Sequence, residues 1–498
     1  MFWADRIAGE IEERFGKPKV PLLIRDEKTV SGRVHVGSMR GVAIHGAVHE
    51  ALIQRGVPTI FKFELNDFDV FDGVPEYLPH EQFEQHVGKL LKDVPAPDSN
   101  YKNFADQYGS EFKSVIESAG FTPEFYWGSE LYESGAMDDS IRLALERSAD
   151  IIHIYKEVSG SQKVEEWLPI SVICEQCKKV TTTHVTQFDG TVVTYSCTCG
   201  HEGRVSPFGG KAKLAWKVEW PAKWKVGGVK IEGGGKDHST KGGSRDVGNH
   251  IAKELFGYEP PFDIPYEFFL VGGRKMSSSK GRGSSAHEIA ALVPTKIFRL
   301  ALLGKDITQQ VNFDPEGDTI PILYDQYDKL AENYWAGVQD DYSRLFTLIH
   351  PGRGVPQKSV LPRFSQVAFI VQMPHLDLQK EFPDANKDEL AERALYAKRW
   401  LEQYAPEKYV FKLHEELPEA ARSLSAEQKQ ALAVVHDYIA SREAMPSGEE
   451  LHQKLHELKE FKAIYLAFLG KESGPKAGWF LSVLPREFVI KRLHEASA

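Results

Sequence analysis

The feature that most constrains the fold of this chain is a pair of short motifs. His35-Val36-Gly37-Ser38 lies near the start, and Lys275-Met276-Ser277-Ser278-Ser279-Lys280 lies far downstream. The first motif follows an apolar run at residues 20–24 and precedes a helical pattern. This order predicts a strand–loop–helix unit that presents backbone N–H groups and a positive helix end to phosphate. The second motif is flanked by glycines and carries two ammonium groups, which suit a loop closing over an anionic leaving group. Together they predict a site for the triphosphate of ATP, whereas separately they read as a turn histidine and a basic surface loop.

The size and charge of the chain limit the classes of protein to which it can belong. With 498 residues it is too long for one compact core. No apolar run reaches membrane-spanning length and the N-terminus reads as an amphipathic helix, so we expect a cytoplasmic protein with no membrane partner. A net charge of −10 argues against indiscriminate coating of nucleic acid. A local excess of lysine at residues 211–241 leaves a shaped RNA partner open.

Apolar strand-like runs alternate with helical patterns over residues 20 to about 160, as in α/β proteins. The expected strands are residues 20–24, 59–65, 123–127, 229–232 and 265–271, and the expected helices include 101–119 and 140–159. From about residue 290 the chain is helical, rich in Ala, Leu and Glu. Two predicted capping boxes, Ser425-x-x-Gln428 and Ser447-x-x-Glu450, open helices there.

All four cysteines fall between residues 174 and 199, as Cys174-x2-Cys177 and Cys197-x-Cys199. This spacing predicts a closed, structural Zn²⁺ site on a small β-ribbon with Asp189-Gly190 at its turn. Two disulfides or four free thiols are the alternatives. The tight second pair also leaves open that His184 or His201 replaces one thiolate.

With these residues assembled, the chain resembles the class I aminoacyl-tRNA synthetases, and among them the class I lysyl-tRNA synthetases. The first motif resembles the family's HIGH signature and the second its KMSKS signature. The block at residues 31–41, the strand end at 66–69, the four-cysteine insertion and the segments 219–224 and 234–238 add to the likeness, which spans roughly residues 20 to 300. Two departures stand out: Ser38 replaces the second histidine, and the second basic position of the loop is Lys280.

The resemblance implies an α/β fold with a Rossmann-like parallel-sheet catalytic domain, a small zinc-ribbon insertion and an all-α C-terminal half. We expect the first half of the catalytic domain at residues 1–165 and the insertion at 166–210. The second half of the catalytic domain, with the KMSSSK loop, follows at 211–290. A connecting helical domain that contacts the tRNA stem is expected at 291–355 and a helical anticodon-binding domain at 356–498.

The resemblance also implies a two-step reaction. An amino-acid carboxylate attacks the α-phosphate of ATP, releasing pyrophosphate, and the aminoacyl group then passes to the terminal ribose of tRNA. Aligning the reactants and offsetting charge on the departing pyrophosphate, with Mg²⁺, would fall to His35, Lys275 and Lys280. The implied ATP-binding residues are Gly32, His35, Gly37, Ser38, Gly235, Asp237, Lys275, Met276, Ser277 and Lys280. Asp237 has a turn-forming role as its alternative.

The amino-acid pocket is expected to use Asp26, Thr29, Asp67, Trp220, His238 and Tyr266. A lysine ammonium needs carboxylate or carbonyl oxygen once it is desolvated, and Asp26, Glu27, Asp67 and Asp69 are the candidates. Glutamate, the substrate of related enzymes, would need arginine, for which Arg25 and Arg33 are close enough. Core packing is the alternative role for Trp220 and Trp224.

Three functions therefore stay open. The first is a lysyl-tRNA synthetase whose helical half reads tRNA(Lys), with Lys398, Arg399, Trp400 and Tyr404 as candidate contacts and a buried Trp400 as the alternative. The second is another class I synthetase, such as the glutamyl type, or a stand-alone nucleotidyl transferase. The third is a non-catalytic, synthetase-derived RNA-binding protein.

Overall fold

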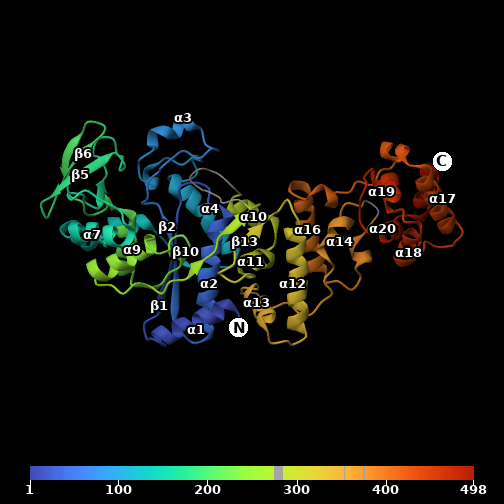
Figure 1. Ribbon diagram of the computed structural model, residues 1–498, viewed down its shortest axis with the longest axis horizontal. Helices are drawn as coiled ribbons and strands as arrows, with labels where there is room; N and C mark the ends of the chain where they lie inside the picture. Colours follow the sequence, from blue (N-terminus) through green and yellow to red (C-terminus); the bar gives the residue numbers. More distant parts are fainter. Residues whose placement is uncertain (274–283, 353, 374–375) are drawn as a thin grey trace. The chain divides into compact units, whose positions relative to one another are not determined.

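The computed structural model describes residues 1–273, 284–352, 354–373 and 376–498, and Figure 1 labels its elements. The chain forms two compact units. Unit 1 comprises residues 1–313 and 336–355, and unit 2 comprises residues 314–335 and 356–498. Residues 275–280, and with them Lys275, Met276, Ser277 and Lys280, lie outside the described residues.

Unit 1 is built on a four-stranded sheet in which every neighbouring pair of strands is parallel. The order is β3 (Glu124–Trp127), β2 (Thr59–Asn66), β1 (Leu22–Thr29) and β9 (Val229–Ile231). The sequence thus located all four strands. The first is displaced, because Val20 is exposed and the charged residues 25–28 continue β1. Burial of these charges is possible because neighbouring strands and helix α8 (Trp216–Gly227) supply partners of opposite sign.

Helices pack against both the sheet and each other in unit 1. Helix α2 (Met39–Gln54) contacts α1 (Trp3–Phe15), β1 and β2, and it lies beside β1 in Figure 1. Twelve of its 16 residues are buried, which explains its largely apolar sequence. Helix α4 (Phe104–Ser118) confirms the helix expected at residues 101–119 and is capped by Asn103, whose side chain accepts from Asp106 N–H.

Two expected elements are divided in the structure. The helix predicted at residues 140–159 is interrupted at Arg147, which lies outside helical geometry between α6 (Asp138–Glu146) and α7 (Ser148–Ser159). The strand predicted at residues 265–271 changes partner midway. Its first part, β11 (Pro265–Tyr266), pairs with β10 (Gly234–Gly235), and its second part, β12 (Phe269–Val271), pairs with β13 (Val311–Phe313).

The cysteine-rich insertion forms a three-stranded antiparallel ribbon of β5 (Thr183–Phe188), β6 (Val193–Cys197) and β7 (Glu202–Val205). The predicted turn is confirmed. Asp189 Oδ1 accepts from the N–H groups of Thr191 and Val192, and Gly190 adopts a φ of 96°. β4 (Ile170–Val172) and β8 (Ala212–Leu214) pair where the chain enters and leaves the insertion.

Unit 2 is helical, with no named strand among its described residues. Its longer helices are α12 (Thr319–Trp335), α16 (Lys387–Gln403), α17 (Ala426–Ala440), α18 (Gly448–Leu458), α19 (Phe461–Leu469) and α21 (Arg486–Ser497). Both predicted capping boxes are present, at Ser425 and Ser447. Across the described ranges, no helix combines the length and apolar character required to cross a membrane.

Candidate active site

His35 stands at the carboxyl end of the sheet, in the connection from β1 to α2. It is extended and leads into a 3₁₀ turn, η1 (Val36–Ser38), which continues directly into α2. The turn is tightly packed around Gly37. A Cβ on Gly37 would lie 2.9 Å from His35 Nδ1 and 3.0 Å from the carbonyl oxygen of Phe269, so only glycine fits there.

The residues on both sides of the second motif contact this turn. Before the motif, β12 packs on η1 through Phe269. After it, Val36 N–H donates to the Ser284 carbonyl at 3.2 Å, and Ala286 N–H donates to the Val34 carbonyl at 2.8 Å. Ser285 then caps helix α10 (Ala286–Leu292) through a capping box. The fold therefore brings the start and the end of the segment that carries Lys275 and Lys280 to the His35 turn.

The other predicted nucleotide contacts lie on tight backbone segments. Gly32 has a φ of 144°, a conformation that favours glycine. Gly235 belongs to β10, and a Cβ on it would lie 2.8 Å from Asp237 Oδ1. His238 N–H donates to the Gly235 carbonyl at 2.9 Å, which closes this glycine-rich turn.

A network of buried charges lies on the face of β1 that carries residues 25, 27 and 29. Arg25, fully buried, donates to Glu64 at 2.6 Å, to Glu232 at 2.7 Å and to Tyr126 at 3.0 Å, and it also pairs with Glu27 Oε2. Every nitrogen of this guanidinium is thus engaged by the protein itself. Four of its five N–H groups donate to these partners, and the three carboxylates around it disfavour a further carboxylate from a substrate.

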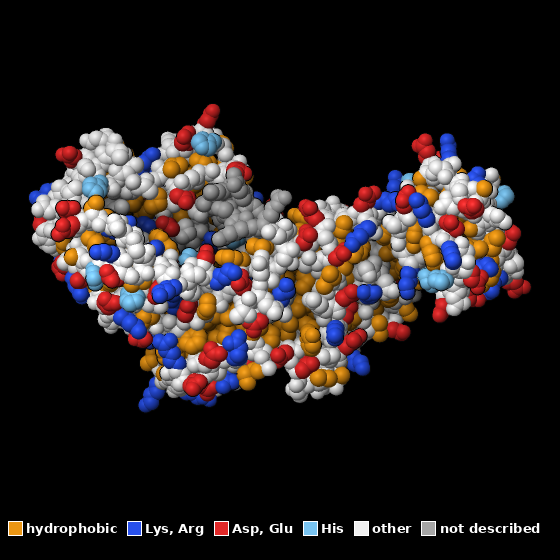
Figure 2. All heavy atoms as spheres, viewed as in Figure 1, with side chains coloured by type: hydrophobic (Ala, Val, Ile, Leu, Met, Phe, Trp, Pro, Cys, Tyr) orange, Lys and Arg blue, Asp and Glu red, His pale blue; other side chains and the backbone are white. Residues whose placement is uncertain are grey.

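Two lysines complete the network. Lys223 Nζ lies 2.6 Å from Glu64 Oε1 and 3.3 Å from Glu219 Oε1, and Lys213 Nζ lies 2.5 Å from Glu219 Oε2. Both lysines are buried. The lysine-rich segment at 211–241 is therefore not a continuous basic surface, as its composition had suggested. Figure 2 likewise shows acidic and basic side chains interspersed over the visible surface of each unit.

The network shifts the pKa values of two of its carboxylates, Glu64 and Glu27, in opposite directions. Burial acts to raise the pKa of Glu64, but Lys223 and Arg25 outweigh it and lower that pKa to about 2. For Glu27 burial prevails, helped by the neighbouring Glu64 and Glu232, so its pKa is raised despite Arg25 and Lys223. Glu64 is thereby a fixed anion, and Glu27 is short of positive partners.

A pocket of about 330 Å³ opens beside this network. Its lining residues are Glu27, Thr29, Asn66, Asp69, Trp216, Glu219, Trp220 and Lys223. Thr29 and Trp220 were expected in the amino-acid pocket, and His238 packs edge-on against both Trp216 and Trp220 with centroids 5.8 Å away. The sequence did not lead us to place Trp216 and Lys223 in this pocket. The helical spacing of Trp216, Trp220 and Lys223 on α8 (Trp216–Gly227) could have indicated that they share one face with Trp220.

The remaining expected pocket residues lie elsewhere in unit 1. Asp26 is on the opposite face of β1, 3.4 Å from His45 Nδ1, and both Asp26 and Tyr266 pack against Gly41 of α2. Asp67 accepts from the backbone N–H and the hydroxyl of Ser129, each at 2.7 Å. Neither Asp26 nor Asp67 lines the pocket beside Glu27.

The four cysteine sulfurs all lie within 4.8 Å of one another. Cys174 and Cys199 are 3.7 Å apart, as are Cys177 and Cys197. These separations are far longer than a disulfide bond of about 2.05 Å. A tetrahedral site with Zn–S bonds of about 2.3 Å has sulfur–sulfur edges of roughly 3.8 Å, so the donor set fits a structural zinc ion without either histidine.

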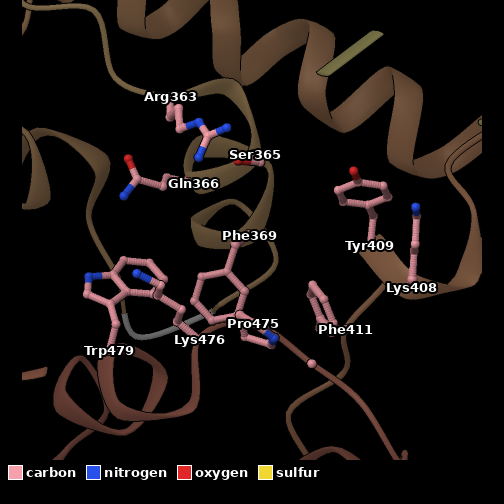
Figure 3. A pocket seen from close by; sticks show the side chains of 11 residues that line it. Arg363, Ser365, Gln366, Phe369, Lys408, Tyr409, Phe411, Pro475, Lys476 and Trp479 are labelled. Atoms are coloured by element: carbon pink, nitrogen blue, oxygen red, sulfur yellow. The ribbon is translucent and has the colours of Figure 1, made fainter. Parts of the chain in front are cut away.

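Unit 2 contains a second pocket, of about 350 Å³, lined by aromatic and cationic side chains. Figure 3 shows Phe369 between Trp479 and Phe411, with Tyr409 and Lys408 farther along the wall. The Phe369 ring lies edge-on to Trp479 at 5.1 Å and to Phe411 at 5.8 Å. The cations at its rim are neutralised in part, since Arg363 pairs with Asp325 at 2.6 Å and Lys408 with Asp318 at 2.6 Å.

Trp400, one of the candidate tRNA contacts, is fully buried and donates to the Pro315 carbonyl at 2.9 Å. The alternative of a buried Trp400 is therefore confirmed. The aromatic lining of the unit 2 pocket comes instead from residues that the sequence did not single out, because Phe369, Phe411 and Trp479 lie on separate segments that only the fold assembles.

Comparison with known proteins agrees with this geometry. A family model described as "tRNA synthetases class I (K)" matches residues 1–350. The chain therefore belongs to the class I tRNA synthetase family, whose members are aminoacyl-tRNA ligases.

Relatives extend the similarity over the full length. A "Lysine--tRNA ligase" from Methanosarcina barkeri is 35% identical over 539 residues, covering 100% of this chain and 98% of that protein. A "Lysine--tRNA ligase" from Archaeoglobus fulgidus is 31% identical and covers 100% of both chains. Another from Methanocaldococcus jannaschii is also 31% identical, with 99% of each chain covered.

Proposed function

We propose that this protein is a lysine–tRNA ligase, which activates lysine with ATP and transfers it to the 3′ end of tRNA(Lys). The full-length similarity to proteins of that name supports the substrate. The observation that carries the chemistry is the contact of Phe269 and Ser284 with the turn of His35 and Gly37, since these residues border the KMSSSK segment on either side.

In this proposal the ATP phosphates bind at the His35 turn and the start of α2. His35 donates to the α-phosphate as it becomes pentacovalent, while Lys275, Lys280 and Mg²⁺ offset the charge of departing pyrophosphate. Gly37 leaves room for close approach of the nucleotide, and Asp237 accepts from the ribose hydroxyls. The displacement needs no enzyme nucleophile, because alignment and charge stabilisation suffice for this kind of phosphoryl chemistry.

The amino acid occupies the pocket beside Thr29, Trp220 and His238. The charges around this pocket favour lysine over glutamate. Arg25 is paired with Glu27, Glu64 and Glu232, and Arg33 lies on the surface with Glu111 at 3.2 Å. No arginine lines the pocket among the described residues.

The pocket of unit 2 is proposed to hold an unstacked base of the tRNA anticodon. Half-buried aromatic rings such as Trp479 and Tyr409 can bind a base by stacking, with the rim cations toward the backbone phosphates. The four cysteines are proposed to bind one structural Zn²⁺ that holds the ribbon. Metal analysis should return about one equivalent of zinc, and a fully active metal-free protein would exclude this role.

Amino-acid-dependent pyrophosphate exchange, run with each of the twenty amino acids and with and without total tRNA, tests the proposal. Exchange with lysine alone is the expected result. Exchange with glutamate would identify a glutamyl-type enzyme, and no exchange under either condition would indicate a non-catalytic RNA-binding protein.

A further inference from the structure

The charges around the pocket of unit 1 do not balance. Three cations, Arg25, Lys213 and Lys223, face five carboxylates, namely Glu27, Glu64, Asp69, Glu219 and Glu232. Lys28, which interacts with both Asp26 and Glu27, and Asp26 itself add one charge of each sign and leave this difference unchanged. The network therefore carries two negative charges in excess, at a place where buried charge is costly unless it is paired.

Three of the five carboxylates line the pocket, namely Glu27, Asp69 and Glu219. The side chains of Glu64, Glu219 and Glu232 are at most 5% exposed, whereas those of Glu27 and Asp69 are 31% and 35% exposed. Both oxygens of Glu219 are also engaged, because Oε1 accepts from the Tyr132 hydroxyl at 2.9 Å and Oε2 lies 2.5 Å from Lys213 Nζ. Glu27 and Asp69 are therefore the carboxylates most open to an incoming cation.

Asp69 already has three polar partners. Its Oδ2 accepts from the Thr29 hydroxyl at 3.0 Å, its Oδ1 accepts from Val70 N–H at 2.9 Å, and Lys213 Nζ lies 3.7 Å away. Glu27 is different, because Arg25 and Lys223 both approach its Oε2. Among the described residues, no hydrogen bond or ion pair engages Glu27 Oε1.

Glu27 lies deeper in the pocket than Thr29, because of its position on β1. Glu27 and Thr29 are two residues apart on one face of the strand, which corresponds to roughly 6.6 Å along it. Thr29 is nearer the carboxyl end of the strand, where parallel sheets bind ligands, and Glu27 lies deeper. Trp216 and Trp220, stacked with centroids 5.8 Å apart, form an apolar wall beside them.

We infer that Glu27 Oε1 accepts the side-chain ammonium of the amino-acid substrate and thereby selects a long, unbranched, positively terminated side chain. The methylenes of such a side chain run from Thr29 along the tryptophan wall, and its ammonium offsets part of the excess negative charge. The inference rests on the proposed ligase function and specifies how its amino-acid site works. Asp69 stays paired with Thr29 and Lys213.

The test compares Glu27→Gln, which keeps the shape and removes the charge, with Glu124→Gln in the full-length protein. Glu124 lies on β3 of the same sheet, 64% exposed, 3.5 Å from Lys62. Pyrophosphate exchange with total tRNA gives KM and kcat for lysine, ATP and norleucine, which lacks the ammonium. Glu27→Gln should raise the KM for lysine about 10- to 100-fold, leave the KM for ATP within about twofold, and reduce the preference for lysine over norleucine. Glu124→Gln should match the unmodified protein.

Two further measurements cover a variant that loses catalysis or folds poorly. Equilibrium dialysis with labelled lysine reports binding directly, and Glu27→Asp keeps the charge but withdraws it by one methylene. Glu27→Asp should shift preference from lysine toward homolysine, whose side chain is one methylene longer. An unchanged lysine KM and affinity in Glu27→Gln, or a loss confined to kcat, would overturn the role of Glu27. Exchange by the unmodified protein with another amino acid and not lysine would instead overturn the proposed function.

Discussion

The pocket beside Glu27 in unit 1 and the aromatic pocket of unit 2 are similar in volume but differ in how their charges are held. In unit 1, Arg25, Lys223 and Glu64 are buried in a network of fixed geometry. In unit 2, the cations at the rim are exposed and pair with surface carboxylates, while aromatic rings form the floor. Buried charges interact strongly and hold one geometry, whereas exposed pairs are screened. The first pocket suits a small charged ligand in one orientation, and the second suits a flat base.

The two pockets should differ most in how much their charge pairs contribute to the free energy of unfolding. Lys223→Met leaves Glu64 Oε1 buried without its ammonium partner and Glu219 with only Lys213, so the free energy of unfolding of unit 1 should fall by about 3–5 kcal/mol. Asp325→Asn removes the partner of the exposed Arg363 and should cost less than about 1 kcal/mol. Urea unfolding followed by tryptophan fluorescence measures both. Equal losses would mean that the two charge clusters do not differ as described.

Catalysis should depend on the His35 turn and not on unit 2. His35→Ala should slow adenylate formation about 10²- to 10³-fold because it removes a donor to the reacting phosphate. Its affinity for tRNA should not change. His80→Ala, an exposed histidine of the same unit, is the matched control. Single-turnover formation of the adenylate is the measurement, and an unaltered rate would remove His35 from the mechanism.

The second motif should behave in the same way, with a smaller effect. Lys280→Ala should lower the rate of adenylate formation at least about tenfold, with little change in lysine affinity, because the ammonium acts on the departing pyrophosphate. Pre-steady-state pyrophosphate release reports this step. A lysine affinity that falls in parallel would place Lys280 in binding and not in charge stabilisation.

Stacking in unit 2 should contribute less again. Trp479→Ala should weaken tRNA binding by about 1–3 kcal/mol, the usual contribution of one stacked base, and leave lysine affinity unchanged. Trp335→Ala is the control, since this indole donates to the Pro356 carbonyl and does not line the pocket. Filter binding measures the affinity. Equal effects of the two variants would argue against a base in this pocket.

The smallest effect is expected for Lys476, an exposed cation at the pocket of unit 2. Lys476→Ala should weaken binding of all tRNAs alike and reduce the slope of log affinity against log salt by about one. Titrations at several salt concentrations give this slope. A change in selectivity among tRNAs would instead indicate contact with a base.

Local patterns in the sequence predicted much of the fold. The strands at 59–65 and 123–127, the hairpin at Asp189-Gly190 and the caps at Ser425 and Ser447 depend on neighbouring residues, and the structure confirms them. The split of residues 265–271 between two partners depends on distant pairing, which no local pattern encodes.

The charge network shows the limit of sequence reasoning at the site. Lys213 and Lys223 read as members of a basic surface, since lysine is rarely buried without a partner. Glu64 comes from a strand that only the fold brings to Lys223, whereas Glu219 lies four residues before Lys223 on α8, a pairing that helical spacing could have predicted. Glu27 also depends on the fold. From the sequence we expected Asp26 in the amino-acid pocket, but the two residues lie on opposite faces of β1 and Glu27 lines the pocket.

A crystal structure with a non-hydrolysable lysyl-adenylate analogue, lysyl-sulfamoyl-adenosine, would locate both the reacting phosphate and the lysine side chain. We expect the sulfamoyl group beside His35 and Gly37, the lysine chain along Trp220, and its ammonium within hydrogen-bonding distance of Glu27 Oε1. An analogue bound with its sulfamoyl group away from the His35 turn, or with its ammonium turned away from Glu27, would contradict this expectation.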